Sequence, residues 1–232
     1  MAAAADLQFA LPEIITAFQK ANPRAAVSVA YGSSGNFYAQ IRNGAPFDVF
    51  LSADAEYPTG LVQEGLAVRG SLTRYAVGRI AIWVPASSRL DLDRQQIHSL
   101  EADSVKHVAI ANPQHAPYGR AAEAALHSLG VYDRIAPKLV MGENIAQTLE
   151  FVESGAAEAG IVALSLASAP AVRGKGRYWE IPATVYPPIE QAGVVLARAR
   201  DRRAATTFLT FLGSDAAARI LTNYGFSVRG RD

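Results

Sequence analysis

The sequence contains no cysteine among its 232 residues, which excludes disulfide bonds, thiolate catalysis and thiolate metal sites. Charge of one sign is not in excess either, because 22 basic residues face 21 acidic ones. A net charge of +1 predicts no basic surface for nucleic acid. No apolar run approaches the roughly 20 residues of a membrane-spanning helix. The remaining composition, 50% hydrophobic and 19% charged, is typical of globular proteins.

Motifs of known enzyme classes are also missing. The Gly32-Ser33-Ser34-Gly35 segment lacks the G-x-S-x-G spacing of a nucleophile elbow, and no phosphate-binding loop or dinucleotide fingerprint follows a predicted strand. We therefore expect a protein that is not an enzyme. The four histidines do not fall at metal-ligand spacings and are expected at the surface or at helix ends: His98, His107, His115 and His127.

Apolar runs alternate with helical periodicity along the whole chain. Leu11, Ile14, Ile15 and Phe18 fall on one face of a helix, which we expect to start near residues 7–9 and to end near Asn22. Alternation with short loops predicts an α/β fold with mostly parallel sheets covered by helices on both faces. Strands are expected near residues 26–31, 47–52, 78–84, 107–111, 139–141, 160–164, 177–181 and 192–197.

Two crossings divide the predicted elements into two lobes. The segment Trp83-Val84-Pro85 and the Pro-rich stretch 182–188 lie about a hundred residues apart along the chain. We predict a discontinuous lobe of residues 1–83 with 188–232 and a continuous lobe of residues 84–187. The ligand is expected in the cleft between the lobes, which would close by rotation about the crossings. A single doubly wound domain is the alternative.

Several turns between a strand and a helix share one design. A turn of this kind presents backbone N–H groups at the positive end of a helix, where an anion can bind. Four turns qualify, at Ala5-Asp6, Ser33-Ser34, Tyr118 and Asn144-Ile145. Each has a plainer interpretation: Asp6, Ser33, Ser34 and Asn144 could only cap their helices, and Tyr118 could only pack.

The same segments carry a resemblance to a known family. Together with Gly44-Ala45-Pro46-Phe47-Asp48-Val49-Phe50-Leu51-Ser52-Ala53-Asp54 and the stretch 112–119, they resemble the periplasmic molybdate-binding proteins of ABC transporters over essentially the whole chain. The resemblance implies a two-lobed periplasmic-binding-protein fold that holds molybdate or tungstate without a cofactor. It also implies a periplasmic monomer whose partner is a membrane permease and whose leader is absent from this sequence. A cytosolic protein with an irregular start, Met1 followed by four alanines, is the alternative.

Carried over position by position, the family's anion contacts fall on five residues of this chain, with molybdenum held as its oxyanion and not by direct protein ligands: Ala5, Asp6, Ser34, Tyr118 and Ile145. Relatives usually have Ser, Thr or Asn in the first turn. Because a carboxylate repels a dianion, we expect Asp6 to cap the first helix and to offer only its backbone. Another branch of the family uses a Tyr where this chain has Ala163, so Tyr118 indicates the first branch.

None of the five predicted contact residues is Lys or Arg. Neutral donors favour a fully ionised tetrahedral oxyanion, since a protonated phosphate would leave its O–H without an acceptor. The competing interpretations are a sulfate- or phosphate-binding protein, the effector-binding domain of a transcription regulator, and lastly an enzyme.

Overall fold

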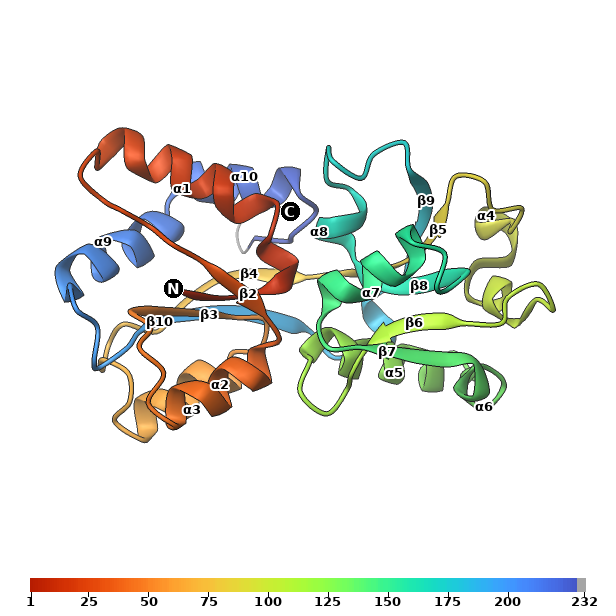
Figure 1. Cartoon of the computed structure of the whole chain (residues 1–232), viewed down its shortest axis with the longest axis horizontal. Coiled ribbons are helices and arrows are strands. Elements are labelled where there is room, and N and C mark those ends of the chain that lie inside the picture. The colour runs from red at the N-terminus through yellow and green to blue at the C-terminus, as the bar shows by residue number, and fades with distance from the viewer. Residues whose placement is uncertain (229–232) are drawn as a thin grey trace. The chain divides into compact units, whose positions relative to one another are not determined.

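The chain forms two compact α/β units in a computed structural model that describes residues 1–228 (Figure 1). The first unit consists of Met1–Gly78 and the segment from Glu190 onward, and the second consists of Arg79–Ile189. The predicted α/β fold class is confirmed. The strand expected near residues 78–84 is β5 (Ile80–Pro85), whereas β4 (Thr73–Gly78), which belongs to the other sheet and is separated from β5 by Arg79, was not predicted from the sequence.

The first unit is built on a five-stranded sheet with the order β2-β1-β3-β10-β4. Strands β1, β2 and β3 are parallel, and β10 runs antiparallel to β3. Its elements, in chain order, are β1 (Ala2–Ala4), η1 (Ala5–Leu7), α1 (Ala10–Ala21), β2 (Ala30–Gly32), α2 (Ser34–Arg42), β3 (Val49–Ser52), α3 (Glu56–Gln63), β4 (Thr73–Gly78), β10 (Ile189–Val195), α9 (Arg202–Leu212) and α10 (Asp215–Asn223).

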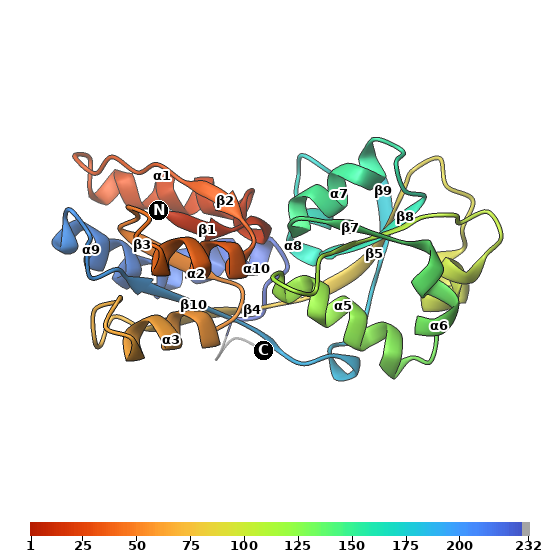
Figure 2. The same ribbon diagram turned by 60° about the horizontal axis from the view of Figure 1, so that its bottom comes forward.

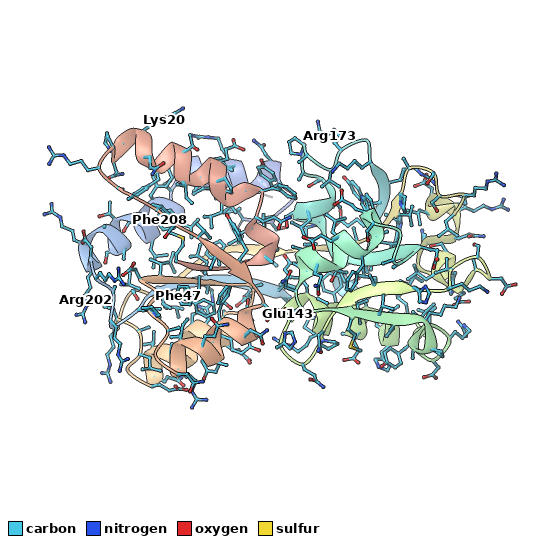
Figure 3. The ribbon with its side chains drawn as sticks, in the orientation of Figure 1. Lys20, Phe47, Glu143, Arg173, Arg202 and Phe208 are labelled. Carbon is cyan, nitrogen blue, oxygen red and sulfur yellow. The ribbon has the colours of Figure 1, made fainter. Side chains whose placement is uncertain are left out.

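Neighbouring residues of the central strands belong to two different hydrophobic clusters, as expected when a sheet is covered on both faces. Leu51 packs with α1, α9 and α10, whereas Phe50 packs with α2 and α3. Phe18 meets Phe208 edge-on at 5.2 Å between ring centroids in the first cluster. Phe37 meets Phe47 at 5.6 Å in the second. Figure 3 labels one aromatic side chain of each cluster, Phe208 and Phe47.

The second unit has a five-stranded sheet with the order β7-β6-β8-β5-β9. Strands β6, β7 and β8 are parallel, and β5 runs antiparallel to both β8 and β9. Helix α5 covers one face, with α6 packed beside it, and α7 covers the other (Figure 2). Its elements are β5 (Ile80–Pro85), α4 (Leu92–Gln95), η2 (Gln96–Glu101), β6 (Val108–Ala111), α5 (Pro117–Ser128), α6 (Tyr132–Ile135), η3 (Ala136–Lys138), β7 (Leu139–Gly142), α7 (Ile145–Glu153), β8 (Ala159–Ala163), α8 (Leu164–Ala167), β9 (Gly176–Glu180) and η4 (Ala183–Val185).

Each sheet therefore contains three mutually parallel strands and a strand that runs against them, β10 in the first unit and β5 in the second, which is more mixed than the βα alternation of the sequence suggests. The strands on either side of the unit boundary account for the difference, because β5 and β10 run against the parallel strands beside them. Within residues 1–228, no helix has both the length and the apolar character needed to cross a membrane.

Candidate functional site

Two turns of the first unit start from paired positions in its sheet. Strand β1 ends at Ala4 and β2 ends at Gly32, and these two residues are partners in parallel register. The carboxyl ends of parallel strands lie at the same edge of a sheet. Helices η1 and α2, which follow directly, therefore start side by side. This edge holds the three contact residues predicted in the first unit: Ala5, Asp6 and Ser34.

The two serines of the second turn have different roles. Ser33 is the N-cap of α2, and its Oγ accepts a hydrogen bond from the Asn36 N–H at 3.3 Å. Ser34 is the first residue of the helix and is only 1% exposed. Its Oγ accepts a hydrogen bond from the Ala53 N–H at 3.0 Å. Since that bond uses a lone pair, the hydroxyl proton of Ser34 can be donated to an acceptor at the edge of the sheet.

Asp6 does not cap the first helix, so that prediction is wrong. The N-cap residue of η1 is Ala4 and that of α1 is Phe9. Asp6 lies inside η1, whereas a capping side chain must precede the first turn. The residue is 1% exposed, and its Oδ2 accepts a hydrogen bond from Gln191 Nε2 at 2.7 Å.

Gln191 in turn connects Asp6 to Tyr75. The Tyr75 hydroxyl donates to Gln191 Oε1 at 3.0 Å, and it also lies 3.5 Å from the carbonyl oxygen of Ser52. Burial, and secondly the negative charge of Asp6, raise the pKa of Tyr75 well above its usual value, so its hydroxyl keeps its proton. Sequence reasoning missed Gln191 and Tyr75. The available signal was a glutamine directly before the apolar residues 192–195 of β10, because a buried amide needs a partner.

The second unit repeats the arrangement of paired turns. Strand β6 ends at Ala111 and β7 ends at Gly142, and these residues are partners in parallel register. The Asn112 N–H extends the ladder by donating to the Gly142 carbonyl at 2.8 Å. Helices α5 and α7 follow these two strands, so the predicted contact residues Tyr118 and Ile145 start from one edge of this sheet.

Helix α5 starts close against the end of β6. Pro117 is its first residue, where the missing N–H of proline is not needed, and Tyr118 is its second. Tyr118 is 2% exposed. A Cβ on Gly119 would lie 2.1 Å from the Ala111 carbonyl oxygen, so glycine is required for this close approach.

Asn144 caps helix α7, as the sequence predicts. Its Oδ1 accepts hydrogen bonds from the N–H groups of Ala146 and Gln147 at 3.0 and 3.1 Å. Its carbonyl oxygen accepts from the Thr148 N–H at 3.1 Å. Asn144 therefore serves three N–H groups of the first turn, and none of these bonds involves the N–H of Ile145.

The described part of the chain, residues 1–228, contains no cluster of three or more His, Cys, Asp or Glu side chains suited to holding a metal ion. The chemistry that the four turns offer is thus hydrogen-bond donation from N–H and O–H groups at helix starts, which suits an oxyanion. Two α/β units of this kind define the two-lobed class of solute-binding proteins.

The sequence matches the family of bacterial extracellular solute-binding proteins over residues 1–227, and the chain belongs to that family. The molybdate-binding protein ModA of Rhodobacter capsulatus is 45% identical over 202 residues, which cover 86% of this chain and 77% of the relative. ModA of Azotobacter vinelandii is 37% identical over 229 residues, which cover 99% and 89%. The resemblance seen in the sequence is confirmed by these relatives.

Solved structures agree with the sequence relatives. The periplasmic molybdate-binding protein of Azotobacter vinelandii superposes with a TM-score of 0.90 at 33% identity, covering 98% of both chains. The sulfate-binding protein SubI of Mycobacterium tuberculosis superposes with a TM-score of 0.78 at 17% identity, covering 99% of this chain and 86% of SubI. At 17% identity the second match is evidence for the fold alone. The fold by itself does not determine which ligand a protein binds.

Two substitutions of the α7 cap Asn144 should show whether its side-chain oxygen is what stabilises the helix. Asn144→Ala removes the acceptor of two N–H groups and should lower the free energy of unfolding by about 1 kcal/mol, within a range of roughly 0.5–2. Asn144→Asp keeps the acceptor and should retain most of that stability. Urea unfolding of the three proteins measures both effects. Equal destabilisation by both substitutions would contradict the assigned role of the side-chain oxygen.

Proposed function

We propose that this protein binds molybdate or tungstate with high affinity outside the cytoplasm and delivers it to the permease of an ABC importer. The observation that carries the proposal is the pair of adjacent strand-to-helix turns in each unit, which hold the predicted contact residues. The names of its relatives at 37% and 45% identity support molybdate as the ligand. Both units would supply contacts: Ala5, Asp6 and Ser34 from the first, and Tyr118 and Ile145 from the second.

The charge of the anion would be met by dipoles. The proposed donors are backbone N–H groups at helix starts, the Ser34 hydroxyl and the Tyr118 phenol, and all of them are neutral. Such a set suits a fully ionised tetrahedral oxyanion. Hydrogen phosphate would bring an O–H that needs an acceptor, and leaving it unpaired costs about 1–3 kcal/mol.

The remaining parts of the proposal follow from this binding role. The protein would be a periplasmic monomer that releases its ligand unchanged, so we propose that it is not an enzyme. Its protein partner would be the permease, and it would bind no nucleic acid, in keeping with its net charge of +1.

Molybdate should raise the melting temperature of the protein. A ligand that binds only the folded state at a hundredfold excess over its dissociation constant adds about 2.7 kcal/mol to stability. Thermal scans with molybdate, tungstate, sulfate and phosphate at equal concentration measure the effect. We expect shifts with the first two anions. A shift with sulfate or phosphate alone would replace the proposed ligand, and chemical turnover of the ligand would indicate an enzyme.

Ser34 and Ser33 should respond differently to removal of the hydroxyl. Ser34→Ala deletes a proposed donor to a desolvated anion and should weaken molybdate binding by about 1.5–3 kcal/mol. Ser33→Ala deletes the cap of α2 and should reduce stability by about 0.5–2 kcal/mol with a smaller effect on binding. Calorimetric titration and urea unfolding of both variants give the two quantities. Weaker binding by Ser33→Ala than by Ser34→Ala would reverse the assignment.

Tyr118→Phe tests whether the phenol binds the anion or only packs. The substitution keeps the buried ring and removes one O–H donor. If the phenol donates to the oxyanion, molybdate affinity should fall by about 1.5–3 kcal/mol while the melting temperature of the ligand-free protein stays constant. Equal affinity of the two proteins would leave Tyr118 with a packing role, and a lower melting temperature would point to a structural hydrogen bond.

A further inference from the structure

A hydrogen-bonded network of buried polar side chains, which we call the Asp6 network, lies in the first unit beneath its two turns. It starts at the carboxylate of Asp6 in η1, passes through Gln191 on β10 and ends at Tyr75 on β4. Asp6 and Gln191 are 185 positions apart in the sequence, and Tyr75 and Gln191 are 116 positions apart. Gln191 is completely buried, so its amide has no access to bulk water. Each donor of a polar group buried this deeply must face an acceptor, and each acceptor a donor, within hydrogen-bond distance.

In the Asp6 network, each hydrogen bond has a defined donor and a defined acceptor. Gln191 turns its NH₂ group to Asp6, whose Oδ2 accepts the hydrogen bond at 2.7 Å. Its carbonyl oxygen then faces Tyr75, which must donate to it. Each group has one correct orientation, and the last donor is a phenol that keeps its proton.

The Asp6 network also connects the two turns of the unit. The Tyr75 hydroxyl lies 3.5 Å from the carbonyl oxygen of Ser52, the last residue of β3. The next residue, Ala53, donates its N–H to the Oγ of Ser34. Gln191 and Tyr75 therefore lie between the turn that holds Asp6 and the partner that orients the Ser34 hydroxyl.

We propose that Gln191 is a positioning residue for anion binding. It holds the Asp6 carboxylate inside the unit and away from the bound oxyanion, and with Tyr75 it fixes the Ala5-Asp6 turn against the Ser34 turn. This inference rests on the proposed function. It explains how a turn can carry an aspartate and still bind a dianion, because the hydrogen bond from Gln191 holds the carboxylate toward β10.

Exchanging the two polar groups gives the sharpest test. Gln191→Glu is nearly isosteric, but it places two carboxylates face to face and removes the donor between them. Asp6 must then move, and we expect molybdate to bind about tenfold more weakly or worse, the loss typical of one hydrogen bond to a charged group. In the double variant Asp6→Asn/Gln191→Glu the new amide donates to the new carboxylate. Its affinity should return to within about threefold of that of Asp6→Asn alone.

The comparison is a double-mutant cycle measured by calorimetric titration with molybdate. Ser99→Ala is the matched control, because it removes the hydroxyl of another fully buried residue, whose 2.6 Å hydrogen bond to the Gln96 carbonyl lies in the second unit. This variant should lose stability and keep its affinity. Wild-type affinity in Gln191→Glu would overturn the inference, and so would a double variant as weak as Gln191→Glu. Failure of the wild-type protein to bind molybdate would instead overturn the proposed function, and the inference with it.

Tyr75→Phe decides the question if Gln191→Glu does not fold. The variant keeps the ring and removes the hydroxyl that donates to Gln191 and lies 3.5 Å from the Ser52 carbonyl oxygen. We expect a severalfold loss of molybdate affinity with a native circular dichroism spectrum. Unchanged affinity in this variant would show that the Asp6 network has no positioning role.

Discussion

Parallel pairing of strands that both lead into helices is the constraint on which the candidate site depends. In each unit two such strands end at partnered residues, Ala4 with Gly32 and Ala111 with Gly142. The helices that follow must then start at one edge, with their first N–H groups near one another. An antiparallel pair would send the two helix starts to opposite edges of the sheet. Mixed strand directions elsewhere in the sheets are tolerated because they leave these two pairs unchanged.

Within each turn, one residue satisfies the helix and its neighbour is left for another partner. Ser33 caps α2, while Ser34 is oriented by the Ala53 N–H. Asn144 caps α7 with two side-chain hydrogen bonds, none of which involves Ile145. This division matters because an N–H that already serves the fold cannot also bind a ligand without loss of stability, whereas a hydroxyl that accepts one hydrogen bond still has a proton to donate. It explains why adjacent residues of similar chemistry are not interchangeable.

The local features of these turns could be predicted from the sequence, and the non-local ones could not. Caps, helix stripes and the βα rhythm depend on residues a few positions apart, so the cap at Asn144 and the turn into a helix at Tyr118 could be predicted. The role of Asp6 was not, because its partner Gln191 lies 185 residues away. Local reasoning assigned Asp6 to the commonest role of an aspartate before a helix. The fold instead brings β10 beneath η1 and offers the carboxylate an amide.

The Asp6 network and the proposed anion site meet negative charge by the same physical means. A buried carboxylate is costly to keep ionised unless donors replace the water that it has lost. Gln191 supplies a neutral N–H dipole, whose orientation is set in turn by the Tyr75 hydroxyl. The proposed oxyanion contacts are likewise neutral dipoles, fixed in place by the sheet edge and by the helix caps. Because fixed dipoles need no reorganisation when the charge arrives, the rigidity of their supports determines how well they stabilise it. The unit can therefore hold a permanent carboxylate and a reversible oxyanion a few residues apart, provided that each faces its own set of donors.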